Sequence, residues 1–109
     1  MILDMTAMEE TLLPHFKGGE GELRAKMFSD ERNRFLRGTL APGCTIGYHT
    51  HEGDSEIFYV LEGTPTYNDG GTERQVAPGD VLICPEGTGH ALSNPTDQTA
   101  VVMALIVYA

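Results

Sequence analysis

Three of the four histidines and one glutamate lie at spacings suited to a single metal site. His49 and His51 are two residues apart, so on a strand both imidazoles point to the same face. The segment 52–55, Glu-Gly-Asp-Ser, has the composition of a turn. We therefore expect 49–51 and Glu56 to belong to the two strands of a hairpin, with Glu56 facing the same interior as the histidines.

His90 is the fourth candidate ligand. It follows a Pro-Glu-Gly-Thr-Gly loop, and closure of the sheet into a barrel would bring it opposite the other three. Three neutral imidazoles and one carboxylate suit Mn, Fe, Ni, Co or Zn and leave coordination positions open for water or substrate. The four predicted metal ligands, called the His–Glu cluster below, are His49, His51, Glu56 and His90.

The predicted ligands lie inside two regularly spaced segments, 43–63 and 79–94. The first reads Gly, five residues, His-x-His, four residues, Glu, six residues, Gly; the second reads Gly, five residues, Pro-x-Gly, two residues, His, three residues, Asn. These segments resemble the two signature motifs of the cupin superfamily, and every specified position matches, which makes coincidence negligible. The matching residues are Gly43, His49, His51, Glu56, Gly63, Gly79, Pro85, Gly87, His90 and Asn94.

The resemblance implies a fold, a cofactor and a range of activities. The expected fold is all-β: a double-stranded β-helix, or jelly-roll, in which two antiparallel sheets pack into a barrel. The expected cofactor is one divalent transition metal per chain, held by the His–Glu cluster. Cupins include dioxygenases, oxalate-type decarboxylases, sugar-phosphate isomerases, sugar-binding proteins and ligand-sensing domains, so the resemblance alone does not select an activity.

Length and composition agree with one small β domain spanning 1–109. The chain is long enough for one core and too short for two. Thirteen glycines and six prolines fall between short apolar runs, as in all-β sandwiches and barrels. We expect 1–22 to form an N-terminal arm or a short helix or strand, since Thr6 and Glu9 could open a helix that Pro14 stops.

The net charge of the chain limits the classes of partner that we expect it to bind. A net charge of −9 with only seven lysines and arginines argues against nucleic acid and against anionic membranes. It leaves a small anionic ligand open, because a bound cation dominates its local field. No apolar run is long enough to span a membrane, and the N-terminus lacks the basic region of a secretory signal, so we expect a cytoplasmic protein.

Apolar residues occupy both faces of two expected strands, 57–61 and 101–108. A barrel wall needs only its inner face apolar, so the outer face must be covered. We expect a second copy of the chain to cover it and form a homodimer; the alternative cover is the N-terminal segment.

Four residues are candidates for a substrate pocket. Phe58 and Val60 share the strand face of Glu56. Arg37 lies in the expected strand 34–40, where an inward arginine would bind a carboxylate; the alternative is a solvated arginine. Met103 represents one face of the last strand, and the sequence does not show which face points inward.

The sequence predicts a small metalloenzyme, similar to dioxygenases or decarboxylases, that chelates a compact oxo acid, hydroxy acid or carbonyl compound at the metal. One alternative is a non-catalytic protein that binds a small ligand or a sugar, or senses a ligand. A second alternative is an isomerase, which is disfavoured because no tight basic cluster for a phosphorylated sugar is present.

Overall fold

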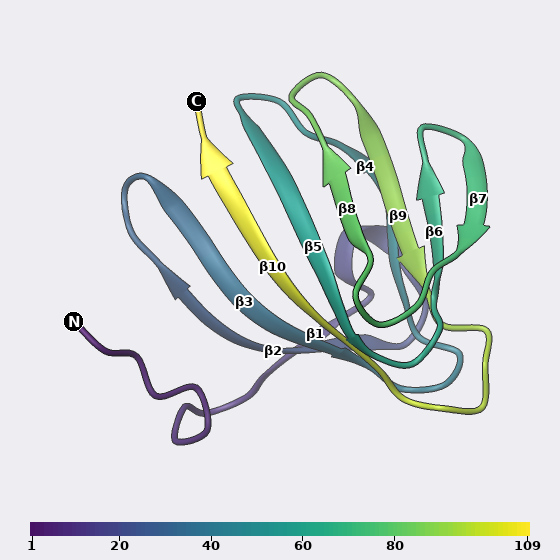
Figure 1. The fold of residues 1–109 in the computed structure, drawn as a ribbon, viewed down its shortest axis with the longest axis horizontal. Coiled ribbons are helices and arrows are strands. Elements are labelled where there is room, and N and C mark those ends of the chain that lie inside the picture. The colour runs from purple at the N-terminus through teal and green to yellow at the C-terminus, as the bar shows by residue number, and fades with distance from the viewer.

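Ten strands and one short 3-10 helix make up the regular structure of residues 1–109, all of which the computed structural model describes. Figure 1 shows these elements as two facing layers with little other structure. The elements are β1 (Thr11–Pro14), η1 (Phe16–Gly18), β2 (Glu22–Ser29), β3 (Asn33–Leu40), β4 (Thr45–Thr50), β5 (Asp54–Glu62), β6 (Thr66–Asp69), β7 (Thr72–Gln75), β8 (Val81–Cys84), β9 (Gly89–Ser93) and β10 (Ala100–Tyr108).

The strands form two antiparallel sheets. The six-stranded sheet has the order β1-β2-β3-β10-β5-β8, and the four-stranded sheet has the order β4-β9-β6-β7 (Figure 1). The last strand therefore lies in the middle of the larger sheet, between β3 and β5. This architecture confirms the all-β, two-sheet fold expected from the sequence.

The predicted hairpin around Glu56 is wrong. β4 pairs with β9, whereas β5 pairs with β10 and β8, so the two strands belong to different sheets. The segment 51–53 carries the chain from one sheet across to the other. Glu56 still faces the interior, but it reaches the histidines from the opposite wall of the barrel.

Alternation along the strands places the core between the sheets. On β5, Glu56, Phe58 and Val60 are buried, and the residues between them are exposed. On β2, Leu23 and Ala25 are buried in the same way. Because successive strand residues point to opposite faces, this pattern identifies the inner face of the larger sheet.

The register decides which face of β10 points inward. Val102 pairs with Val60, and Ala104 pairs with Phe58, so the even-numbered residues of β10 share the inner face. Met103 pairs with Tyr59 and belongs to the outer face. The prediction that Met103 lines the pocket is therefore wrong. The prediction failed because β10 is apolar on both faces, so its sequence has no alternation of polar and apolar residues that would identify the inner face.

Gly63 and Asn94 each fix the geometry of a loop. Gly63 has φ +79°, and a side chain there would come within 2.6 Å of the Thr99 carbonyl oxygen, so this turn requires glycine. The buried amide of Asn94 donates to the carbonyl oxygens of Leu40 at 2.9 Å and Gln98 at 2.7 Å. Asn94 thus ties its loop to the backbone.

The N-terminal segment forms a strand and a 3-10 turn, so of the alternatives expected for 1–22 the structure has the strand, and the helix that Thr6 could open does not form. Asp4 accepts hydrogen bonds from the backbone N–H and the hydroxyl of Thr6, which makes a local turn. The next residues form β1, which pairs with β2 at the edge of the larger sheet. No helix in the structure has the length and apolar character needed to cross a membrane.

Candidate metal centre

Three strands and one loop bring the His–Glu cluster together. His49 lies on β4 directly opposite His90 on β9, and His51 immediately follows β4. Glu56 projects from β5 in the other sheet. One ligand atom from each of the four residues lies within 4.8 Å of the others, so all four could hold one metal ion.

The outward-facing nitrogens of two histidines meet acceptors. His49 Nδ1 lies 2.8 Å from the Gly47 carbonyl oxygen, and His51 Nδ1 lies 2.7 Å from Oδ1 of Asp54. Carbonyl and carboxylate oxygens only accept, so each Nδ1 carries the proton and donates it. In the neutral imidazoles the Nε2 atoms then hold lone pairs, which is the state in which histidine binds a metal.

Tyr67 orients the third histidine. Its hydroxyl lies 2.8 Å from Nδ1 of His90. Burial raises the pKa of the Tyr67 phenol, with smaller contributions from the negative charges around it, so the phenol is neutral. A neutral phenol oxygen can accept the Nδ1 proton of His90, which leaves Nε2 of His90 as a third lone pair facing the centre.

The inner oxygen and nitrogen atoms of the cluster lie close together, and no positively charged protein group lies among them. Oε1 of Glu56 lies 3.1 Å from Nε2 of His51 and 3.0 Å from Nε2 of His90, and the two Nε2 atoms are 2.9 Å apart. Burial lowers the pKa of His49, and positive charge on the other two histidines would lower it further, which favours neutral imidazole. A single cation satisfies all four atoms at once, so this donor set fits a divalent transition metal.

Aromatic packing holds His90 in place from behind. The Phe58 ring stacks on the His90 ring with centroids 5.3 Å apart and planes 19° from parallel. Tyr67 meets both rings edge to face. His51, Glu56 and His90 are each at most 5% exposed, whereas His49 is half-buried. The cluster is therefore largely shielded from solvent, and His49 is its most exposed member.

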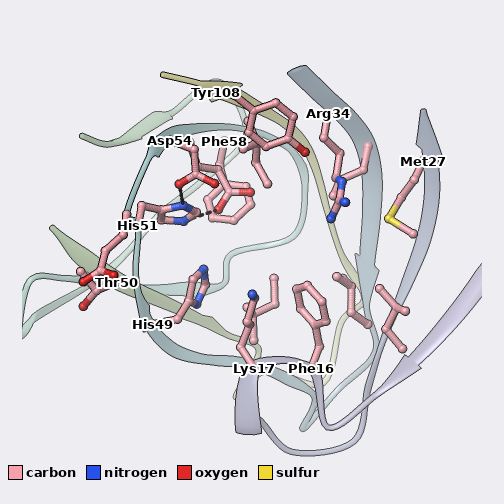
Figure 2. Close-up of a pocket in the computed structure, with 17 residues that line it drawn as sticks. Phe16, Lys17, Met27, Arg34, His49, Thr50, His51, Asp54, Phe58 and Tyr108 are labelled. Atoms are coloured by element: carbon pink, nitrogen blue, oxygen red, sulfur yellow. Dashed lines mark hydrogen bonds and ion pairs between the residues drawn. The ribbon is translucent and has the colours of Figure 1, made fainter. Parts of the chain in front are cut away.

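A cavity of about 480 Å³ opens onto the cluster. Figure 2 shows His49 and His51 on one side of this space and Arg34, Met27 and Phe16 across it. Its walls are mainly apolar. The lining residues are Leu13, Phe16, Lys17, Leu23, Met27, Arg34, Leu36, Ile46, His49, Thr50, His51, Glu52, Asp54, Glu56, Phe58, Ile106 and Tyr108.

Only one of the four predicted pocket residues lines this cavity. Phe58 does so. Val60 has no exposed surface; it lies two residues further along β5, paired with Val102 inside the core. Met103 faces outward, as described above. Arg37 also lies on the outer face, because it alternates with the buried Leu36 and pairs with Met103.

The structure adds residues that the sequence analysis missed. Arg34 shares the inner face of β3 with Leu36 and Leu40, and this two-residue spacing was a readable signal. Phe16 and Lys17 come from η1, which packs against β4 and closes one end of the cavity. The close approach depends on Gly47, where a side chain would collide with the Lys17 carbonyl oxygen.

Known proteins resemble this chain over its full length. An oxalate-binding protein of Thermotoga maritima is 30% identical, and the match covers 98% of this chain and 93% of that protein. The crystal structure of a predicted oxalate decarboxylase from Thermotoga maritima superimposes with a TM-score of 0.94 at 27% identity, covering all of both chains.

A third structure resembles the chain in fold alone. A putative sugar phosphate isomerase from Acidithiobacillus ferrooxidans gives a TM-score of 0.85 at 22% identity, over 99% of this chain and 75% of that one.

The family model described as the cupin domain matches residues 36–108, which include both motifs and the whole His–Glu cluster. The fold, the four converging ligands and this match together show that the chain belongs to the cupin domain family.

Proposed function

We propose that the chain binds a divalent transition metal (Mn, Fe, Ni, Co or Zn) at the His–Glu cluster and uses it to bind and convert a small oxo or hydroxy acid. The observation that carries this proposal is the convergence of three imidazole nitrogens and a carboxylate at the end of an apolar cavity of about 480 Å³. A metal bound there would act as a Lewis acid toward a chelating carboxylate or carbonyl group.

The protein's own residues supply orientation and a dry environment. Gly47, Asp54 and Tyr67 hold the three imidazole rings so that Nε2 faces the centre. Phe58 and Ile106 line the cavity with apolar surface beside Glu56. Such walls favour a ligand with a hydrocarbon portion and strengthen polar interactions by excluding water.

The comparisons with Thermotoga maritima support an acid as the ligand. The matching sequence is named an oxalate-binding protein, and the matching crystal structure is described as a predicted oxalate decarboxylase. The first name favours a second candidate function, in which this chain binds a small acid without converting it. The isomerase alternative gains less support, because that neighbour shares only the fold with this chain.

Binding and turnover can be measured separately. We expect the protein loaded with Mn, Fe, Co, Ni or Zn to be stabilised against heat by oxalate or by a 2-oxo acid, and to consume one of these acids in an NMR assay with and without dioxygen. Stabilisation without consumption would support the binding protein instead. If none of the metal-loaded forms were stabilised by any of the acids, the proposed function would be wrong.

We further propose that a second copy of the chain covers the outer face of the larger sheet. Large apolar residues on β5, β8 and β10 are exposed there, and the register places them side by side: Ile57 beside Ile83, and Tyr59 beside Val81. Isolated monomers rarely expose a continuous apolar surface of this kind. The outer-face patch consists of Ile57, Tyr59, Leu61, Val81, Ile83 and Val107.

The dimer prediction is tested by mass in solution. Light scattering after size-exclusion chromatography should give twice the 11.8 kDa of one chain. Ile83→Glu should shift the protein to the mass of one chain, because a charge in an apolar interface is strongly unfavourable. Thr72→Glu, at an exposed position of β7 in the smaller sheet, is the control and should remain dimeric. A wild-type monomer would rule this interface out. The cytoplasmic location expected from the sequence remains a prediction.

A further inference from the structure

Arg34 places a positive charge inside the cavity. It lies on the inner face of β3, and Figure 2 shows its guanidinium directed into the cavity, across from the histidines. The residue is half-buried. Buried or partly buried arginines ordinarily have an anionic partner, because the guanidinium loses solvation when it leaves water.

No protein group serves as that partner. Arg34 takes part in none of the ion pairs or side-chain hydrogen bonds of the structure, whereas Arg24 is paired with both Glu10 and Glu22. The five N–H donors of the Arg34 guanidinium are therefore available to a ligand in the cavity. Their planar arrangement matches the two oxygens of a carboxylate.

The sheet register sets Arg34 at a defined separation from the cluster. Glu56 pairs with Ile106, and Ile106 pairs with Arg34, so the three residues form one row across β5, β10 and β3. Neighbouring strands lie about 5 Å apart, which places the backbones of Glu56 and Arg34 about 10 Å apart. All three residues line the cavity, with the apolar Ile106 in the middle.

A second cation lies on another wall of the same cavity. Figure 2 shows Lys17 and Phe16 projecting from η1 toward the space between His49 and Arg34. The Lys17 ammonium group lies 5.5 Å from the centre of the Phe16 ring. Two of only seven basic residues in a chain of net charge −9 thus line this one cavity. The acidic lining residues are otherwise engaged or exposed: Asp54 binds His51, and Glu52 is open to solvent.

We propose that Arg34 determines specificity by binding a second carboxylate of the ligand, remote from the metal. The ligand class is a dicarboxylic acid with a chelating 2-oxo or 2-hydroxy acid at one end, a short hydrocarbon chain beside Ile106, and a carboxylate at Arg34. This inference rests on the proposed metal and acid binding. Oxalate does not belong to this ligand class, because its two carboxylates are directly bonded and cannot reach the metal and Arg34 at the same time.

Two ligands that differ in one group test the inference. 2-Oxoglutarate and 2-oxovalerate have the same chelating end and chain length, but only the first has a terminal carboxylate. Their affinities are measured by isothermal titration calorimetry with protein carrying one equivalent of Mn(II). We expect wild-type protein to bind 2-oxoglutarate at least about tenfold more tightly, as for a hydrogen bond between charged groups. Arg34→Gln should remove this preference while binding 2-oxovalerate and oxalate as the wild type does.

Two further variants distinguish carboxylate binding by Arg34 from the general effect of removing an arginine or a positive charge. Arg37→Gln removes an arginine from the outer face of the same strand and should retain the full preference. Arg34→Lys keeps the charge without the planar donors and should retain part of it. Equal wild-type affinity for the two oxo acids, unchanged in Arg34→Gln, would overturn the role of Arg34 and leave the proposed function intact. Absence of binding by both oxo acids and oxalate would overturn both.

Discussion

His51→Ala protein is expected to lose the metal that the wild type carries. His51 contributes one of the four converging ligand atoms, and its Nε2 lies 3.1 Å from Oε1 of Glu56. Only His49, Glu56 and His90 remain in the variant, and their positions are set for a site of four ligands, so we expect the affinity for metal to fall steeply. Elemental analysis of protein prepared without chelators or a metal-binding tag should find about one equivalent per wild-type chain and almost none per variant chain.

The same substitution should affect stability only when metal is present. A metal at one hundred times its dissociation constant stabilises the folded protein by about 2.7 kcal/mol. For a domain of this size that corresponds to a Tm difference of about 10 °C or more between wild type and variant. With a chelator the difference should nearly vanish, because without a cation the acceptor atoms of the cluster gain little from lying together. Calorimetry in both conditions measures this.

Asp54→Asn provides a graded comparison. It retains all four ligands and removes only the negative charge that holds Nδ1 of His51 at 2.7 Å. Loss of such an outer partner typically weakens metal binding about 10- to 100-fold, so the variant should bind metal measurably but less tightly than the wild type. Full metal content in His51→Ala would show that the metal lies elsewhere, and a wild type that takes up no metal would remove the basis of the proposed function.

Phe58→Ala is expected to cause the largest loss of stability from a single core substitution. Phe58 is 3% exposed, lies between the sheets and stacks on His90. Truncation of a buried phenylalanine costs about 3 to 5 kcal/mol, because it removes apolar burial and leaves a cavity. This is a large part of the roughly 5 to 15 kcal/mol that stabilises a typical domain. Urea unfolding with the metal removed isolates this packing effect from metal binding.

Phe58→Leu is the matched variant. Leucine keeps most of the apolar volume, so its cost should stay near 1.5 kcal/mol or below. Both variants lose the ring that supports His90, so both should bind metal less tightly than the wild type even where stability is nearly retained. A loss below about 1 kcal/mol in Phe58→Ala would mean that the core closes around the gap, contrary to the close packing expected of a protein interior.

The four residues of the His–Glu cluster could be predicted from the sequence because their types and spacings match two motifs. Part of this pattern is local: His49 and His51 alternate along one chain segment, and several of the motif glycines adopt positive φ in turns. Such preferences depend on φ, on strand alternation and on short-range hydrogen bonds, which a sequence displays directly. The buried face of β5, including Phe58, could be predicted for the same reason.

Only the tertiary structure decided which strands pair and what fills the cavity. β4 and β5 are consecutive and separated by a turn-like segment, yet they enter different sheets, because pairing depends on partners far away in the chain. β10 is apolar on both faces, and only its register with β3 and β5 sets Val102 and Ala104 inward and Met103 outward. The sequence of β10 is apolar at both parities, so its composition does not distinguish the inner face from the outer face.

The two arginines of β3 illustrate the difference between what the sequence shows and what only the tertiary structure shows. Arg34 alternates with Leu36 and Leu40, so its inward direction was already present in the sequence, whereas Arg37 has the opposite parity. What the sequence could not show is that Arg34 has no protein partner and stands in one row with Glu56, because that row exists only when β10 lies between β3 and β5. The sequence by itself determined the residues of the His–Glu cluster; the sheet order, which follows from long-range pairing, decided which residues face them.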